Sequence, residues 1–529
     1  MNEKVSAAAP AGESSGQAPP RGLAVQLIGV DKRFGAVYAN RKVDLSIETG
    51  TIHGIVGENG AGKSTLMKIL YGFYQADGGE IRIKDQPVRI RDPHAAIDAG
   101  IGMVHQHFML VDTFTVLENL ILGAENQFWV RQSFEAAREE LVAIERDYGL
   151  EVDPDALVAD LPVGLQQRVE ILKILFRGAE TIILDEPTAV LTPQETEELF
   201  KILRRLKAEG KTVVLITHKL QEIMEVTDRV TVMRDGAVVG EVKTAETSRE
   251  ELAEMMVGRK VLLRVDKTPA KPGDPVLSVK GLWIADDNHH PVVKDLSFEV
   301  RAGEIYGIAG VSGNGQSELI ETLAGLHDFT DGEVTLQGQE ILSGYQSTHP
   351  RELRQRGLGH VPEDRLRMGV IVNFDASESA ILGYHADPAY NGPLLSQRPR
   401  IVEHCQGLMQ AFDVRPGDPE LRTGAFSGGN QQKLVLAREI ERDPALLLVG
   451  QPTRGVDIGA IEFIHRRLIE MRDAGKAILL VSAELEEILA LADRIAVMHE
   501  GRIVGEMTAA EADRQKIGLL MAGITEDAA

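Results

Sequence analysis

The sequence has almost no cysteine and no long apolar run. Its single cysteine, Cys405, has no partner for an internal disulfide, and we expect a small side chain that is buried or partly buried. No stretch reaches the ~18 apolar residues that span a bilayer, and runs such as Thr212 to Ile216 have the length of a strand. No apolar signal core follows Met1. We therefore expect a reducing, cytoplasmic compartment and a chain that does not cross a membrane by itself.

Positive charge is also scarce. The 57 Lys and Arg residues face 80 Asp and Glu residues, which gives a formal net charge of −23. This surplus repels phosphodiester backbones and anionic lipid headgroups, and no local basic patch interrupts it. We therefore expect no nucleic-acid partner.

The chain contains an internal repeat, which its length of 529 residues also suggests. Asp185-Glu186-Pro187-Thr188 is matched by Gly450-Gln451-Pro452-Thr453, and Thr217-His218-Lys219-Leu220 is matched at the same offset by Ser482-Ala483-Glu484-Leu485. We predict a disordered tail over 1–22, a first domain over 23–258, a linker over 259–275, a second domain over 276–523 and a short tail over 524–529.

Each half alternates short apolar runs with helical spacing. Ile52 to Val56 leads into a glycine-rich turn, and Lys63 to Tyr71 has helical spacing. Thr181 to Leu184 and Val213 to Ile216 are typical of buried parallel strands. The pattern predicts two tandem α/β domains, each with a P-loop position at its first crossover.

The turn Gly57-Glu58-Asn59-Gly60-Ala61-Gly62-Lys63-Ser64 fits the pattern G-x-x-x-x-G-K-[ST]. Its glycines let backbone N–H groups close around phosphate, Lys63 reaches the β- and γ-phosphates, and Ser64 ligates Mg²⁺. Because a predicted strand precedes it and a predicted helix follows, we expect this loop and Thr65 to bind ATP.

Two carboxylates, Asp185 and Glu186, follow the apolar run Ile182 to Leu184. Asp185 would hold Mg²⁺, and Glu186 would polarise the attacking water as general base. An Asp-Glu pair after a strand is often only a solvated turn. Its place downstream of the P-loop and upstream of His218 favours the catalytic interpretation.

Three further residues are candidates by position. His218 follows the next apolar strand after Asp185, where its side chain could meet the γ-phosphate. Gln106 follows the predicted strand Ile101 to Val104 and is a candidate for catalysis and for Mg²⁺. Phe34 precedes the P-loop in the first half and could stack on adenine or be a core residue.

Together these residues resemble the ATP-binding-cassette (ABC) family over residues 23 to 523. The family's Ser-Gly-Gly signature is whole only in the second half, as Ser427-Gly428-Gly429-Asn430, and the aligned first-half segment has Pro162 in place of the serine. The resemblance implies a parallel-sheet core, an antiparallel β subdomain and a helical subdomain in each half. It also implies head-to-tail pairing, with ATP held between the P-loop of one domain and the signature of the other.

Pairing of this kind would create two unequal sites. One would combine these intact residues: Lys63, Ser64, Gln106, Asp185, Glu186, His218, Ser427, Gly428 and Gly429. The other would use the second P-loop, 310–317, with these substitutions: Gln316 for Lys63, Glu363 for Gln106, Gly450 for Asp185, Gln451 for Glu186 and Ala483 for His218. We predict one hydrolytic site per chain and a second that is structural or binds nucleotide weakly.

Two fused ATPase domains without a membrane span of their own must transmit their motion to a partner protein. The fused cassettes with Gln451-Pro452-Thr453-Arg454-Gly455 resemble the ATPases of simple-sugar and nucleoside importers. The resemblance implies integral-membrane permease subunits at the cytoplasmic face of the membrane and, indirectly, an extracytoplasmic binding lipoprotein. Ribose- and galactose-type members usually keep Asp-Glu at positions 450 and 451, so this chain looks closer to nucleoside importers. Sugar import remains the alternative.

Two other classes are less consistent with the sequence. A tandem-cassette factor acting on ribosomes usually keeps both sites and a long charged arm between the cassettes, whereas here the linker is short and the net charge is −23. An inert scaffold does not explain a complete first site. We interpret Glu484, Glu486 and Glu487 as a solvated helix face.

Overall fold

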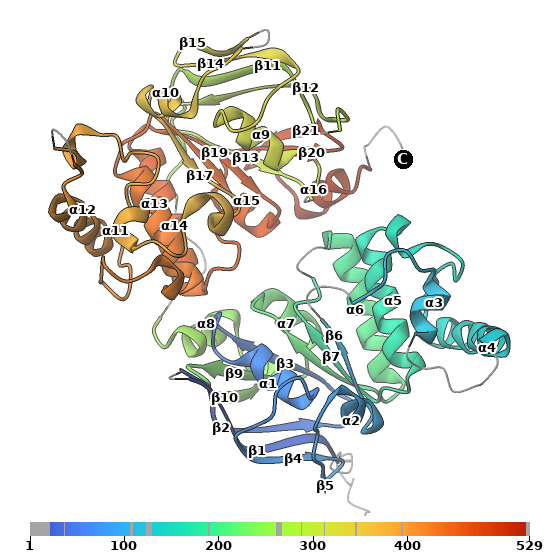
Figure 1. Ribbon diagram of the computed structural model, residues 1–529. Helices are drawn as coiled ribbons and strands as arrows, with labels where there is room; N and C mark the ends of the chain where they lie inside the picture. Colours follow the sequence, from blue (N-terminus) through green and yellow to red (C-terminus); the bar gives the residue numbers. More distant parts are fainter. Residues whose placement is uncertain are drawn as a thin grey trace, which may run out of the picture.

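The computed structural model describes residues 22–35, 37–105, 109–122, 130–188, 191–260, 267–286, 288–311, 313–343, 346–392 and 395–524. These residues form two halves of the same architecture, stacked on one another (Figure 1). The predicted tandem α/β organisation is confirmed. All but one residue of each predicted tail, and part of the predicted linker, lie outside the described residues.

The core of the first half is a mostly parallel sheet of six strands. Its order is β10 (Ala237–Lys243), β9 (Arg229–Arg234), β3 (Ile52–Gly57), β8 (Thr212–Ile216), β7 (Thr181–Asp185) and β6 (Ile101–Val104). Only the β9–β10 pair is antiparallel. Every residue of β3, β7 and β8 is buried, because helices cover one face of the sheet, and a helix together with the antiparallel sheet covers the other.

A second, antiparallel sheet begins the first half. Its order is β2 (Val37–Glu48), β1 (Leu23–Phe34), β4 (Gly78–Ile83) and β5 (Gln86–Pro87). The helices of this half are α1 (Lys63–Leu70), α2 (Pro93–Asp98), α3 (Val116–Ile121), α4 (Val130–Tyr148), α5 (Val163–Phe176), α6 (Pro193–Ala208), α7 (Leu220–Val226) and α8 (Arg249–Val257). Helices α3, α4 and α5 pack together as a helical subdomain.

The second half repeats this plan. Its mostly parallel sheet has the order β17 (Leu358–Val361), β18 (Leu446–Gly450), β19 (Ala477–Ser482), β13 (Ile305–Ala309), β20 (Arg494–His499) and β21 (Arg502–Thr508). Its antiparallel sheet has the order β12 (Pro291–Arg301), β11 (Pro275–Ala285), β14 (Asp331–Leu336), β15 (Gln339–Ser343) and β16 (Gln346–Ser347). The strand order of the parallel sheet therefore matches that of the first half position by position.

The helices of the second half also correspond to those of the first. They are α9 (Gln316–Leu323), α10 (Pro350–Gln355), α11 (Ala376–Ser379), α12 (Arg398–Ala411), α13 (Gly428–Ile440), α14 (Ile458–Asp473), α15 (Leu485–Leu491) and α16 (Arg514–Met521). Cys405, on α12, is buried in an apolar cluster, as expected. Within the described residues, no helix is both long and apolar enough to span a membrane.

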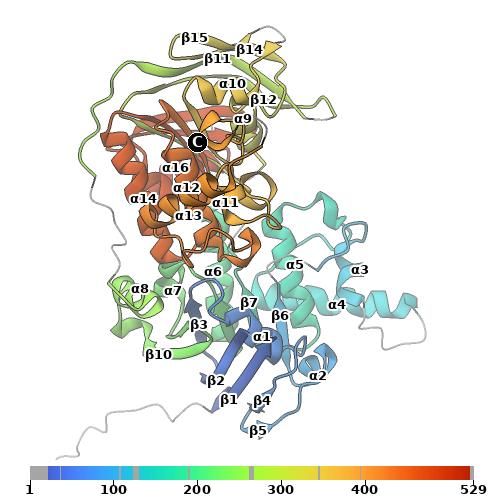
Figure 2. The same ribbon diagram turned by 60° about the vertical axis from the view of Figure 1, so that its left-hand side comes forward.

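The halves face each other in opposite orientations. Their antiparallel sheets lie at the two far ends of the molecule in both views (Figures 1 and 2), and the helical subdomains lie on opposite sides in Figure 1. Ile458, at the start of α14, belongs to the same buried cluster as Leu252 and Met256 of α8. Helix α16 also contacts α6. These contacts place the carboxyl ends of the two parallel sheets near a shared interface.

Candidate active site between the two halves

The first P-loop is a turn that only glycine can make. It follows buried strand β3 and leads into α1, with Gly60 at φ +84° and Gly62 at φ +94°. A Cβ on Gly62 would lie 2.2 Å from the carbonyl oxygen of Ala39, so a side chain is excluded there by contact as well as by backbone conformation. The loop is therefore held close against β2 with its N–H groups at the helix start.

Lys63 is folded back over this loop. Its Nζ donates to the carbonyl oxygens of Gly57 at 2.7 Å and Glu58 at 3.0 Å, and the residue is 6% exposed. Burial lowers the pKa of Lys63, and nearby Glu186, Asp185 and Glu58 oppose that shift. The ammonium thus lies inside the loop in which the sequence predicts phosphate binding.

Ser64 and Asp185 lie together, although they are far apart along the chain. Ser64 Oγ donates to Asp185 Oδ1 at 3.2 Å, and Asp185 is 5% exposed at the end of β7. Burial raises the pKa of Asp185, and the hydrogen bond from Ser64 opposes this. A hydroxyl and a carboxylate oxygen side by side fit the preference of Mg²⁺ for hard oxygen ligands.

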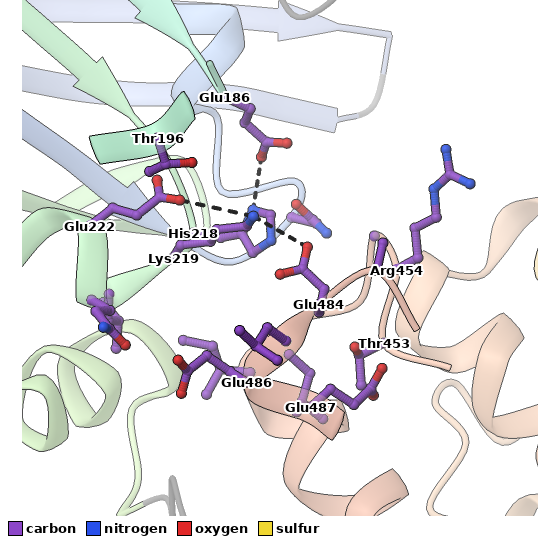
Figure 3. Close-up of a pocket in the computed structure, with 18 of the residues that line it drawn as sticks. Glu186, Thr196, His218, Lys219, Glu222, Thr453, Arg454, Glu484, Glu486 and Glu487 are labelled. Carbon is purple, nitrogen blue, oxygen red and sulfur yellow. Dashed lines mark hydrogen bonds and ion pairs between the residues drawn. The ribbon is translucent and has the colours of Figure 1, made fainter. Parts of the chain in front are cut away.

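Glu186 and His218 form the second close pair. His218 Nδ1 lies 3.0 Å from Glu186 Oε1 (Figure 3). This hydrogen bond lowers the pKa of Glu186 despite its burial, so the side chain is a carboxylate near neutral pH. Glu186 has φ +48° while its N–H donates to Ile216 on the neighbouring strand at 2.8 Å. The sheet therefore fixes a strained backbone that aims this carboxylate towards the P-loop.

The second half forms the opposite wall of this site. A cleft of about 1650 Å³ is lined by Lys63, Ser64, Glu186 and His218 from the first half and by the segment Thr453–Gly455 from the second, among other residues. Figure 3 shows Glu186 and His218 across from Thr453 and Arg454. The site is thus built by both halves.

Glu58 of the P-loop contacts the second half directly. The backbone N–H of Gly459, in the first turn of α14, lies close enough to the Glu58 carboxylate to lower its pKa. Burial, and then the charge of Asp457, raise the pKa of Glu58 to about 7. The motif pattern treats position 58 as arbitrary, so sequence reasoning had no signal that could have found this contact.

The signature residues 427–430 pack against the loop that precedes α14, close to Gly459. Ser427 caps α13 by accepting from the N–H of Asn430, and a Cβ on Gly429 would lie 2.5 Å from Asp457 Oδ2. Asp457 in turn caps α14, the helix that meets Glu58. The signature of the second half is therefore packed against the loop that faces the first P-loop.

The second P-loop keeps the backbone conformation of the first but not all of its side chains. Gly313 and Gly315 have φ of +93° and +96°, and Gln451 has φ +46°, close to the φ of Glu186. Gly450 offers no ligand. Ser317 Oγ instead donates to Glu363 Oε2 at 2.5 Å, and Glu363 pairs with Arg454 at 3.0 Å. The hydroxyl of Ser317, which corresponds to Ser64, is thus hydrogen-bonded to a glutamate that is already paired with an arginine.

Two predicted site residues, Gln106 and Phe34, remain to be placed. Gln106 lies outside the described residues. Phe34, at the end of β1, is 45% exposed and makes an edge contact with Tyr74, with ring centroids 5.2 Å apart. It is therefore not a core residue, and an adenine ring could approach its exposed side.

Glu484, Glu486 and Glu487 do not form the expected solvated face. Glu487 is 4% exposed and lies 3.2 Å from His465, whereas Glu486 is exposed and pairs with Arg514. Glu484 pairs with Lys219 across the interface. The interpretation is wrong for Glu487, because α15 begins at the interface and turns that residue towards α14.

Comparison with known proteins agrees with this architecture. The family model described as ABC transporter matches residues 40–189 and 293–454. The guanosine import ATP-binding protein NupO of Bacillus subtilis is 48% identical over 95% of this chain and 98% of its own length. The nucleoside import ATP-binding protein NupA of Lactococcus lactis is 48% identical over 94% of this chain and 98% of its own length. The ribose import ATP-binding protein RbsA 1 of Rubrobacter xylanophilus is 41% identical over 94% of this chain and 98% of its own length. The chain therefore belongs to the ABC transporter family and is an ATPase with two of the family's domains in tandem.

Proposed function

We propose that this chain hydrolyses ATP at one site per molecule and thereby drives a membrane importer of nucleosides. The observation that carries the single site is the contrast between the two halves. Ser64, Asp185, Glu186 and His218 are joined in pairs by hydrogen bonds in the first half, whereas Gly450 and Ala483 remove two of these groups from the second.

In the proposed site each side chain has a distinct task. Lys63 and the N–H groups of the P-loop bind the phosphates, and Phe34 contacts the adenine. Glu186 accepts the proton of the attacking water, and His218 holds Glu186 in place while contacting the γ-phosphate. From the second half, Ser427, Gly428, Gly429 and Asn430 close over the same nucleotide. A head-to-tail pairing of the halves supports this assignment.

Ser64, Asp185 and Gln106 are the proposed Mg²⁺ ligands. The closeness of the Ser64 hydroxyl and the Asp185 carboxylate supports the first two. When bound, the ion neutralises the charge that develops on the transferring phosphoryl group. In the second half, Ser317, Glu363 and Arg454 form an internal cluster. We therefore expect that site to be structural or to bind nucleotide only weakly.

The proposed partners are integral-membrane permease subunits, with a substrate-binding lipoprotein acting through them. The chain would sit peripherally on the cytoplasmic face of the membrane. The names of the relatives support nucleosides as cargo, since those that import guanosine and nucleosides are 48% identical, against 41% for the ribose importer. A simple sugar is the second candidate, because the ribose importer matches over 94% of the chain.

Uptake in the native host tests the cargo. Deleting the coding sequence should abolish uptake of labelled guanosine, wild-type chain should restore it, and the Glu186→Gln variant should not. Ribose uptake serves as the matched control and should stay unchanged. Loss of ribose uptake with normal guanosine uptake would instead favour the sugar importer, and unchanged uptake of both would contradict the proposal for either cargo.

A further inference from the structure

One ion pair joins equivalent positions of the two halves. Lys219 Nζ lies 3.3 Å from Glu484 Oε1. A dashed line marks this ion pair in Figure 3. Lys219 is the N-cap residue of α7, and Glu484 is the N-cap residue of α15. The internal repeat aligns these same two positions with each other. Two corresponding helices therefore meet start to start at the interface.

A contact between equivalent positions indicates that an approximate two-fold axis relates the two halves and passes close to this ion pair. Where two halves pair about such an axis, a residue close to it meets its own equivalent. Two first halves paired in this way would bring Lys219 against a second Lys219, and two second halves would bring two glutamates together. Only the pairing of unlike halves gives opposite charges at this point.

The surroundings of Lys219 favour a role for this pair. The Lys219 side chain is 25% exposed and that of Glu484 is 42% exposed. A cation at a helix N-terminus is unfavourable, because the first N–H groups carry partial positive charge. Burial lowers the pKa of Lys219, but Glu484 and Glu222 outweigh it and hold that pKa above its usual value. Glu222 is 3.9 Å away on α7, and Glu186 adds a further negative charge.

The pair also adjoins the proposed hydrolytic site. Lys219 follows His218 directly, and its N–H donates to Thr217 Oγ1 at 3.0 Å. Glu484 follows Ala483, whose N–H donates to Gln451 Oε1 at 3.3 Å. A change in the distance between the halves at this point would therefore move Lys219. Its neighbour His218, which is hydrogen-bonded to Glu186, would move with it.

We propose that the Lys219–Glu484 ion pair is a specificity contact, which selects the pairing of a first half with a second half and opposes the pairing of like halves. The inference rests on the proposed head-to-tail site, since it concerns how that site is assembled. Like charges juxtaposed at an interface disfavour a wrong pairing more than an attractive pair strengthens the right one.

Charge reversal at position 484 tests this proposal in the full chain bound to its permease. Glu484→Lys places two ammonium groups together and should lower ATP turnover by about 10-fold, whereas neutral Glu484→Gln should lower it by only about 2-fold. Raising the NaCl concentration should relieve part of the loss in Glu484→Lys, because salt screens repulsion between partly exposed charges.

The decisive variant is the double reversal, Lys219→Glu with Glu484→Lys. It should turn over ATP faster than either single variant, although below wild type, because Glu222 remains next to position 219. A purely structural role predicts that the double variant is the worst of the three. Arg204→Glu is the matched control, because it reverses a cation in an exposed ion pair with Glu225 inside the first half and should leave turnover unchanged.

Two results would overturn the proposal. Full activity in Glu484→Lys would show that the charges do not affect turnover. A double variant no faster than the better of the two single variants would show that opposite signs at the two positions are not what matters. Neither result would contradict the proposal of a single hydrolytic site, which the Glu186→Gln variant tests separately. Failure of this inference and failure of the proposed function are therefore distinguishable.

Discussion

The Glu186→Gln variant should lose ATP turnover by about 10²–10⁴-fold while still binding ATP. An amide cannot accept the proton of the attacking water, whereas the Glu186 carboxylate can, because its hydrogen bond with His218 lowers its pKa. The fold should tolerate the change. Gln451 occupies the equivalent position with φ +46°, against +48° for Glu186, so this chain already contains the variant backbone in its second half.

Gln451→Ala is the internal control for this variant. Its side chain accepts one long hydrogen bond from the N–H of Ala483, at 3.3 Å, and lies in the half that lacks an Asp185 equivalent. We expect turnover close to wild type. Steady-state phosphate release by the chain with its permease measures both variants. Substantial release by Glu186→Gln, or loss in Gln451→Ala comparable to that expected for Glu186→Gln, would refute the assignment.

The second large effect is expected at the signature. Ser427→Pro copies the residue that the first half has at the aligned position, and the backbone accepts it, since Ser427 has φ −62° and Pro162 has φ −54°. The variant removes the hydroxyl proposed to act on ATP bound at Lys63. Loss of one such polar group from a site with developing charge costs ~10²-fold or more, so turnover should fall by about that factor.

Pro162→Ser is the matched control and should leave turnover unchanged, because the P-loop across from it already lacks its lysine. Ser427→Pro also removes a helix cap, which costs ~1 kcal/mol of stability. Thermal unfolding of the purified chain would register that cost separately. If Ser427→Pro folded normally and kept wild-type turnover, the second-half signature would not serve the first P-loop.

Local features of this fold were predictable from the sequence because local rules fix them. Strand β6 spans Ile101–Val104 as expected, and β7 extends the predicted run by one residue, to Asp185. Fully buried parallel strands appear as continuous apolar runs, and the P-loop demands glycines at set positions. The hydrolytic candidates Lys63, Ser64 and Asp185 were identified for the same reason.

Contacts between the halves could not be predicted this way. The approach of the Gly459 N–H to the Glu58 carboxylate brings together residues from different domains, and no pattern along the chain encodes it. The repeat alignment placed Glu363 at the position of Gln106 and so marked it only as a loss. In the structure that carboxylate binds Ser317 and Arg454, which a residue-by-residue alignment does not reveal.

The error at Glu487 has a similar cause. Closely spaced glutamates at a helix start are typical of a solvated face, and the sequence alone favours that interpretation. Packing of α15 against α14 instead buries Glu487 beside His465 and leaves Glu484 to pair with Lys219. Burial of a charged residue depends on its partner, and the partner here lies on another helix or in the other half.

A single-turnover measurement tests the central claim most directly. Chains bound to their permease are saturated with ATP without Mg²⁺ and freed of unbound nucleotide, and Mg²⁺ is then added while phosphate release is followed. One hydrolytic site assembled from both halves predicts at most one phosphate released per chain. A value near two would contradict it, because the second P-loop would then also be hydrolytic.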